Sequence, residues 1–381
     1  MIPYGRHTLY PEDIESVTRV LNEGFLTQGE QVPLFEESVC TYTGARYGIA
    51  CNSGTSGLHI ACLAAGVEKG DLVWTVPNSF AASANCARYC GADIDFVDID
   101  PATRNLSLSA LEHKLSVAKS EDRLPKVIIV VHFAGSSCDM PAIAALTSEL
   151  GIILIEDAAH ALGGTDVNGH KVGRCEYSSM SVLSFHPVKS ITSAEGGMVV
   201  TNDEKIASLL RLYRSHGISR DTERYLDLPS DEPWFYAQYE LGYNYRLSDI
   251  HAALGRAQLK HIEKFVDARY ALAERYDSML ATLPLKRPVL DKNSAWHLYM
   301  VELERHDRKT VFNELRARGV GVNVHYIPIH LHPYYKKLGF TKGMFPNSER
   351  YYDGALTLPL FPSLTLDEQD YVISQLNEIL K

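Results

Sequence analysis

The chain has 381 residues, of which 45% are hydrophobic and 22% are charged. This length exceeds one typical domain and can bury a sizeable core. With 37 Lys and Arg against 47 Asp and Glu, the formal net charge is -10, and the scattered basic residues argue against a nucleic-acid-binding surface. Seven cysteines without a C-x-x-C pair indicate neither a disulfide framework nor a zinc site, so we expect no metal. The apolar runs are too short to cross a bilayer and no apolar signal segment opens the chain, so we expect a cytoplasmic protein away from the membrane.

Short apolar runs alternate with longer amphipathic segments from about residue 46 to residue 216. The expected strands are residues 46–51, 71–76, 93–97, 127–132 and 152–156, and helices are expected at 54–65 and near 79–89. Buried strands that alternate with helices predict right-handed crossovers in a largely parallel sheet. Strands expected at 180–184 and 198–201 are separated by a loop too short for a helix, which predicts antiparallel pairing between them.

The pattern changes in the second half of the chain. A loop is expected at 225–235, where two prolines interrupt any helix, and helical spacing of apolar residues follows over 246–283. Strands are expected at 296–303 and 321–327, with helices at 308–318 and 366–380. The prediction is therefore an α/β protein with two parts. Residues 1–255 form a large domain with a mostly parallel mixed sheet flanked by helices, and residues 256–381 form a small α+β domain.

Residues 52–57, Asn-Ser-Gly-Thr-Ser-Gly, stand directly after an expected strand and directly before an expected helix. Backbone amides at a helix N-terminus, freed by small residues, form a site suited to a phosphate. The alternative is that these residues simply cap the helix, and on this motif alone capping is favoured. The motif is not G-x-G-x-x-G, and no other phosphate loop of the dinucleotide or nucleotidase type is present.

Two further motifs carry ionisable groups. Glu156 and Asp157 end a buried strand and His160 follows, at the sheet edge where α/β proteins bind ligands. A carboxylate there can hold a pyridinium nitrogen protonated, whereas the alternative is a pair of solvated acids and a surface histidine. Lys189 stands in a loop between an apolar strand and the pair Gly196-Gly197, where desolvation would favour a nucleophilic amine, although a lone loop lysine is usually a solvated charge. A phosphate cradle, a strand-end aspartate and a loop lysine, in that order, are the parts that a pyridoxal phosphate enzyme requires.

With these motifs the chain resembles the pyridoxal-phosphate sugar aminotransferases of the DegT/DnrJ type along nearly its whole length. The resemblance rests on residues 26–29 (Leu-Thr-Gln-Gly), 52–57, 156–161, 184–197, 214–217 (Arg-Ser-His-Gly), 242–246 (Gly-Tyr-Asn-Tyr-Arg) and 324–326 (Val-His-Tyr). It implies the fold-type I architecture, pyridoxal 5'-phosphate as cofactor and a homodimer with a shared active site.

The resemblance also implies roles for individual residues. Lys189 would form the Schiff base with the cofactor, Asp157 would pair with the ring nitrogen, and His160 would lie beside the ring near its hydroxyl. The remaining cofactor contacts would be the amides of Thr55 and Ser56, the hydroxyl of Ser184, the stacking ring of Phe80, and Asn244 from the neighbouring subunit. The residues expected in the sugar-nucleotide pocket are Tyr4, Gln28, His325 and Tyr326.

The implied reaction moves an amino group from L-glutamate to C4 of a UDP-linked 4-keto-6-deoxy N-acetyl sugar, as in the family branch that serves pseudaminic acid biosynthesis. The branch that makes 4-amino-4-deoxy-L-arabinose shares much of the pattern, and residue spacing does not separate the two. A sugar dehydrase of the same fold would carry histidine in place of Lys189. A non-catalytic regulator would be expected to have lost part of the Asp157, Ser184, Lys189 and Asn244 set.

Overall fold

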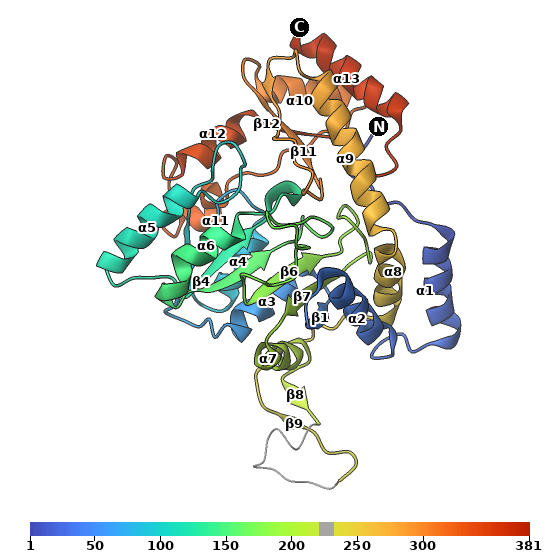
Figure 1. The fold of residues 1–381 in the computed structure, drawn as a ribbon, viewed down its shortest axis with the longest axis vertical. Helices are drawn as coiled ribbons and strands as arrows, with labels where there is room; N and C mark the ends of the chain where they lie inside the picture. The colour runs from blue at the N-terminus through green and yellow to red at the C-terminus, as the bar shows by residue number, and fades with distance from the viewer. Residues whose placement is uncertain (221–231) are drawn as a thin grey trace.

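The computed structural model describes residues 1–220 and 232–381, and a seven-stranded sheet lies at its centre (Figure 1). The strand order is β1-β7-β6-β5-β4-β2-β3. Their bounds are β1 (Tyr47–Cys51), β2 (Leu72–Thr75), β3 (Asp93–Phe96), β4 (Val127–Val131), β5 (Ile153–Asp157), β6 (Met180–Ser184) and β7 (Gly197–Thr201). β7 runs antiparallel to β1 and β6, and the other neighbours are parallel. This confirms the mostly parallel mixed sheet and the antiparallel pair predicted from the sequence.

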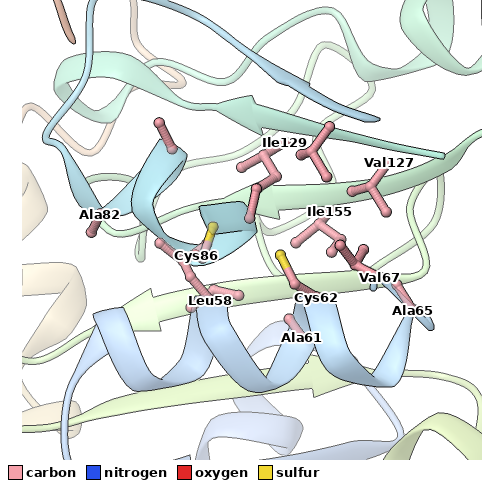
Figure 2. Close-up of a cluster of buried hydrophobic side chains, with 14 of the residues drawn as sticks. Leu58, Ala61, Cys62, Ala65, Val67, Ala82, Cys86, Val127, Ile129 and Ile155 are labelled. Carbon is pink, nitrogen blue, oxygen red and sulfur yellow. The ribbon is translucent and has the colours of Figure 1, made fainter. Parts of the chain in front are cut away.

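Successive side chains of a strand point to opposite faces of the sheet. Because most positions of these strands are apolar, both faces are apolar and helices cover both. One face packs against α3 (Gly54–Ala64), α4 (Ala82–Tyr89) and α7 (Glu204–Arg214). Figure 2 shows Leu58 and Cys62 of α3 pointing toward Ile129 and Ile155 of the sheet. The other face packs against α2 (Gln31–Thr43), α5 (Leu108–Ser120), α6 (Met140–Thr147) and α8 (Asp249–Leu259), and α1 (Pro11–Glu23) lies on α8.

A second hydrophobic cluster lies at one end of the molecule, where the C-terminal elements gather (Figure 1). It is built from α9 (Ile262–Met279), β10 (Leu285–Lys286), β11 (Tyr299–Leu303), α10 (Arg308–Ala317), β12 (Ala355–Leu358) and α13 (Leu366–Leu380). The three strands form an antiparallel sheet in the order β10-β11-β12. Residues 329–345, which include α11 (Pro333–Lys336), instead pack Tyr335 and Phe340 into the cluster around α3 and α4. The division at residue 255 stays a prediction.

Short elements complete the chain. They are the 3-10 helices η1 (Phe133–Gly135), η2 (Ser148–Leu150) and η3 (Ile329–Leu331), helix α12 (Pro346–Gly354), and strands β8 (Ile218–Ser219) and β9 (Ala237–Gln238). β8 and β9 pair as a hairpin that projects from the end of the molecule opposite the C-terminal cluster (Figure 1). Among the described residues, none of the helices combines the length and the apolar character needed to cross a bilayer.

Several sequence predictions needed correction. The strand predicted at 321–327 is wrong, because residues 320 and 323 form only isolated bridges, to Ile2 and Thr357, and β12 takes the place beside β11. The strand predicted at 296–303 begins only at Tyr299, since Trp296 has a φ of 47°, which no strand accommodates. The helical stretch predicted at 246–283 is confirmed as the two helices α8 and α9. The predicted loop at 225–235 lies largely outside the described residues.

β7 passes very close to the start of α3, and a glycine makes this approach possible. A Cβ atom added to Gly197 would lie 2.5 Å from the backbone nitrogen of Gly54 and 2.6 Å from the carbonyl carbon of Ser53. Such distances are well below van der Waals contact, and backbone atoms cannot rotate away as a flexible side chain can. Only glycine at position 197 therefore allows β7 and the start of α3 to keep these positions.

We expect Gly197→Ala to destabilise the protein by about 1–3 kcal/mol, because the new methyl group overpacks a backbone contact. The methyl group should also displace the N-terminus of α3, and this displacement should weaken binding of the phosphate group that is predicted at that helix end. Thermal unfolding and cofactor titration would measure both effects. Gly5→Ala is the control, since its Cβ would meet Val188 at an ordinary 3.5 Å. Equal stability of the two variants would contradict the argument.

Candidate active site

A cavity of about 480 Å³ opens where β5 and β6 end and α3 begins, at the sheet edge predicted from the sequence. Nine of the residues predicted to form a site line it: Tyr4, Thr55, Phe80, Asp157, His160, Ser184, Lys189, His325 and Tyr326. Segments far apart in the sequence meet here, from the N-terminal arm to residues 323–326. Three other predicted residues, Ser56, Gln28 and Asn244, do not line the cavity.

The alternation of side chains along neighbouring strands selects which residues face this cavity. Asp157 is the last residue of β5 and Ser184 is the last residue of β6. Their side chains lie on the face of the sheet that α3 and α4 cover, which is also the face of Ile155 and Val182, two residues earlier in each strand. Glu156 points to the opposite face, where its carboxylate lies 2.7 Å from His132 Nε2 and accepts a bond of 2.5 Å from the Ser178 hydroxyl. The two adjacent acids that the sequence presents thus belong to different environments, and only Asp157 belongs to the cavity.

Asp157 is held by two hydrogen bonds, one to each carboxylate oxygen. Ser83 Oγ donates to Oδ2 over 2.6 Å, and the backbone N–H of Ala159 donates to Oδ1 over 3.2 Å. The side chain is 6% exposed and lines the cavity, so it can present one carboxylate edge to a bound group. Ser83 carries no signal in the sequence, because only the packing of α4 against β5 brings it to Asp157.

Lys189 stands in the loop between β6 and β7 and also lines the cavity. Burial lowers the pKa of its amine to about 8, and the nearby carboxylate of Asp157 opposes part of this shift. The backbone N–H of Lys189 donates to the carbonyl of His186 over 2.9 Å, which closes a turn in the loop. A buried amine with a lowered pKa is suited to act as a nucleophile and base near neutral pH.

Arg269 of α9 bonds to the backbone of the loop that carries Lys189. Nothing in the sequence singled it out. Its guanidinium is 1% exposed and donates to the carbonyls of Leu360 at 2.9 Å, His297 at 3.3 Å and Lys189 at 3.5 Å. Burial lowers the pKa of Arg269 to about 10. Because the guanidinium offers five donors in a fixed plane, it can hold three chain segments in register. The helical periodicity of α9 alone could not distinguish it from a solvated arginine.

His160 is a neutral imidazole whose hydrogen position follows from its contacts. Its Nδ1 accepts the backbone N–H of Ala134 at 3.2 Å, so Nε2 carries the hydrogen and donates to the Tyr326 hydroxyl at 3.2 Å. Burial, and then the charge of Lys189, hold the pKa of His160 well below its ordinary value. The ring lies 4.3 Å from that of His297, another buried histidine that the sequence analysis did not select. His160 thus turns the Tyr326 hydroxyl into a donor toward other groups.

His325, which also lines the cavity, is held by two side-chain partners. Asn323 Nδ2 lies 3.4 Å from its Nε2, and its Nδ1 lies 2.8 Å from the hydroxyl of Thr357. Burial, and then the charge of Lys189, lower the pKa of His325 to about 3, so this ring is also neutral. The ring of Tyr4 lies 5.2 Å from it, which brings the N-terminal arm against the cavity.

Residues 52–57 cap helix α3 and also leave backbone amides free at its N-terminus. The two alternatives that the sequence left open, helix capping and a phosphate site, are therefore compatible. Ser53 Oγ accepts the N–H of Ser56 at 3.1 Å, and the Ser56 hydroxyl donates to Asn52 at 2.5 Å. Within the described residues, the amides of Gly54 and Thr55 have no hydrogen-bond partner, and both residues line the cavity. A Cβ on Gly54 would lie 3.1 Å from that of Ser184, which brings this hydroxyl beside the amides. Unpaired amides and a hydroxyl at a helix N-terminus fit a phosphate group.

The remaining predicted residues lie at the surface. Phe80 is 60% exposed at the cavity wall, with its ring 6.2 Å from that of Tyr326, so one face is available for stacking. Gln28 and Asn244 are exposed outside the cavity of their own chain. All seven cysteines are free thiols, and the described residues contain no group of three or more His, Cys, Asp or Glu that could hold a metal ion.

Comparison with known proteins agrees with this site. Residues 8–377 match the DegT/DnrJ/EryC1/StrS aminotransferase family. The chain is 36% identical to the UDP-4-amino-4,6-dideoxy-N-acetyl-beta-L-altrosamine transaminase of Campylobacter jejuni, over 100% of this chain and 98% of that protein. It is 35% identical to the spore coat polysaccharide biosynthesis protein SpsC of Bacillus subtilis, over 100% of this chain and 97% of that protein.

Solved structures give the same result. Helicobacter pylori PseC, an aminotransferase involved in the biosynthesis of pseudoaminic acid, superposes with a TM-score of 0.90 at 30% identity, over 100% of this chain and 99% of that one. The pyridoxamine-phosphate (PMP) form of the putative sugar aminotransferase Spr1654 from Streptococcus pneumoniae also has a TM-score of 0.90, at 27% identity and with the same coverage.

The fold and the site define an aminotransferase of the fold-type I class. The chain belongs to the DegT/DnrJ/EryC1/StrS aminotransferase family, which confirms the resemblance noted in the sequence. It is a pyridoxal-phosphate-dependent transaminase. The unpaired amides of α3, the buried amine of Lys189 and the carboxylate of Asp157 fit the phosphate, aldehyde and ring nitrogen of that cofactor.

We expect the amine of Lys189 to react with aldehydes at a rate that rises with pH through about 8. Below this pKa the ammonium form dominates and is not nucleophilic, whereas an ordinary lysine amine becomes neutral only around 10.4. Rates of reductive labelling of the apoprotein with a small aldehyde, with the site identified by mass spectrometry, would measure this. A midpoint near 10.4 at Lys189 would show that the amine is not desolvated.

Proposed function

We propose that the protein transfers an amino group from L-glutamate to C4 of a UDP-linked 4-keto-6-deoxy N-acetyl sugar. The observation that carries this proposal is the meeting of Lys189, Asp157 and the free amides of α3 in one cavity. The substrate itself is supported by the named Campylobacter jejuni relative and by PseC. A related activity on a 4-keto-arabinose nucleotide is the alternative, because its motifs are similar.

The geometry of the cavity supports the following cofactor contacts. The amides of Gly54 and Thr55 with the Ser184 hydroxyl would hold the phosphate, and Phe80 would stack on the ring. Ser56 was predicted to contribute its amide, but this amide donates to Ser53, so we assign its place to Gly54. Asp157 would accept a hydrogen bond from the protonated ring nitrogen, and His160 would lie beside the ring.

When bound, pyridoxal phosphate supplies an electron-accepting ring that stabilises a carbanion on the substrate. The chain's own residues then have three tasks. Lys189 Nζ takes the proton from Cα of the amino donor, because its lowered pKa leaves much of the amine neutral near pH 8. Asp157 keeps the ring nitrogen protonated. Tyr4, His325 and Tyr326 would contact the sugar, which is supported by their position in the cavity lining.

A sugar dehydrase is disfavoured because Lys189 is present where that subgroup carries histidine. The test is an absorbance spectrum of the purified protein with pyridoxal phosphate, before and after L-glutamate. Bleaching of the cofactor band by glutamate, and its return with the UDP-4-keto sugar, is the expected result. A band that ignores glutamate would remove glutamate as the donor, and recovery with the arabinose nucleotide alone would favour the alternative.

We expect Lys189→Ala to lower kcat by about 10³-fold or more while leaving the fold intact, because it removes the base and nucleophile together. Stopped assays of amino transfer and circular dichroism would test this. Lys171→Ala, at a lysine of the surface pair with Glu263, is the control. Substantial activity in Lys189→Ala would exclude the proposed mechanism.

We also propose a homodimer in which Asn244 completes the site of the partner subunit. Asn244 and Gln28 are exposed outside the cavity of their own chain, although both belong to motifs that the family resemblance includes. Exposed apolar side chains lie close to both motifs in the sequence: Phe25 at 79%, Trp234 at 70% and Leu241 at 78% exposure. Large apolar side chains, aromatic ones above all, are enriched in the interfaces between protein chains.

Mixed dimers of Asn244→Ala chains with Lys189→Ala chains test this arrangement. If Asn244 acts across the interface, each mixed dimer contains one fully intact site, and we expect about half of the wild-type activity in that species. If Asn244 acts within its own chain, neither site is intact and activity stays at the level of the separate variants. Tandem-tagged purification of the mixed dimer, followed by amino-transfer assays, would distinguish these outcomes.

A further inference from the structure

We propose that Ser83 is a positioning residue for the amino-transfer reaction, which acts by fixing the carboxylate of Asp157. This inference rests on the proposed role of Asp157 as partner of the cofactor ring nitrogen. Ser83 itself does not line the cavity and is fully buried, so any effect on a bound ligand passes through Asp157.

The contact between the two residues is short and joins separate elements. Ser83 belongs to the first turn of α4, Asp157 ends β5, and the Ser83 hydroxyl lies 2.6 Å from Asp157 Oδ2. Oδ1 of the same carboxylate accepts the backbone N–H of Ala159. With one donor on each oxygen, one from α4 and one from the turn that follows β5, rotation of the carboxylate about its Cβ–Cγ bond is restrained. Each oxygen keeps a lone pair for a further donor.

The hydroxyl chain has a direction, which the chemistry of the carboxylate sets. Ser83 Oγ also lies 2.7 Å from Ser79 Oγ. Ionised Asp157 can only accept, so the Ser83 hydrogen points to Asp157, and Ser83 must accept the hydrogen of Ser79. Both hydroxyl hydrogens then point toward the carboxylate, and the chain begins at Ser79, which lines the cavity.

Two hydroxyls of helix α2 behave differently. Ser38 and Thr43 in α2 donate to the carbonyls of Leu34 and Val39, four residues earlier, which is the usual local bond of such side chains. Ser83 instead directs its hydrogen across to the sheet. A hydrogen bond to an ionised carboxylate is stronger than a neutral one, so the Ser83 hydroxyl gains more from Asp157 than from a backbone carbonyl of its own helix. The bond therefore orients Asp157 rather than merely satisfying α4.

Removal of the Ser83 hydroxyl should free the carboxylate to rotate and leave a buried oxygen without its donor. Bonds to charged groups typically stabilise by an amount equivalent to about tenfold or more in an equilibrium constant. We therefore expect Ser83→Ala to raise the Kd for pyridoxal phosphate about tenfold. The midpoint of the pH titration of the bound cofactor's absorbance should also move, because the group that faces the ring nitrogen is displaced.

The experiment compares Ser83→Ala, Ser83→Cys and Ser181→Ala in full-length protein. Ser181 is the matched control, since this buried serine of β6 has no hydrogen-bond partner for its hydroxyl within residues 1–220 and 232–381. Ser83→Cys keeps the side-chain size with a weaker donor, so it tests the proposal if the alanine variant does not fold. The readouts are the Kd for pyridoxal phosphate, the spectral pH titration, and the thermal unfolding of the apoprotein.

The expected result is a raised Kd and a shifted midpoint in both Ser83 variants, larger for alanine, with wild-type values in Ser181→Ala. Wild-type values in the Ser83 variants would overturn the proposal, as would a loss of apoprotein stability without a shifted midpoint. The variant Asp157→Asn separates a failure of the positioning role of Ser83 from a failure of the proposed role of Asp157. If it leaves cofactor binding and spectrum unchanged, the role of Asp157 fails; if it alters both while the Ser83 variants match Ser181→Ala, only the positioning role fails.

Discussion

The backbone contact between β7 and the start of α3 is the constraint on which the site depends. The antiparallel ladder of β6 and β7 ends at the pair Ser184 and Gly197, so the loop that carries Lys189 is closed at its base by this pair. The same Gly197 lies against Ser53 and Gly54. One glycine thus holds the amine loop beside the amides that fit a phosphate, because any side chain there would force the two apart.

Desolvation then gives the cavity its chemistry. The amine of Lys189 shares the cavity with Asp157 and with the buried imidazoles of His160 and His325, whose pKa values are lowered. Neutral imidazoles add no positive charge beside the amine, and their ring nitrogens are occupied by fixed partners. The result is an amine that is partly neutral near pH 8 and a carboxylate clamped by two donors. Burial favours the neutral form of the amine, whereas hydrogen-bond donors favour the charged form of the carboxylate. The two groups therefore differ in charge preference within one cavity because their immediate surroundings differ.

Arg269 connects the cavity to the C-terminal part of the chain. Its guanidinium bonds to the carbonyls of Lys189, His297 and Leu360, so α9 and the C-terminal region are joined to the loop that carries the reactive amine. His297 in turn packs against His160. These hydrogen bonds and ring contacts connect the C-terminal cluster to the cavity, and they give the buried guanidinium the carbonyl partners that its charge requires.

The sequence by itself determined the α/β class, the strands from 46 to 201 and the family, and it singled out Asp157, Lys189 and Ser184, which the structure brings to one cavity. These follow from local signals: buried apolar runs, a polar residue where a strand ends, and ordered motifs. Tertiary structure alone decided that Glu156 leaves the cavity and that β12 replaces the strand expected at 321–327. It also decided that Ser83 bonds to Asp157 and that Arg269 bonds to the carbonyl of Lys189. Neither residue carries a local signal, because a buried serine or arginine in a helix takes its role from the partners that packing brings to it.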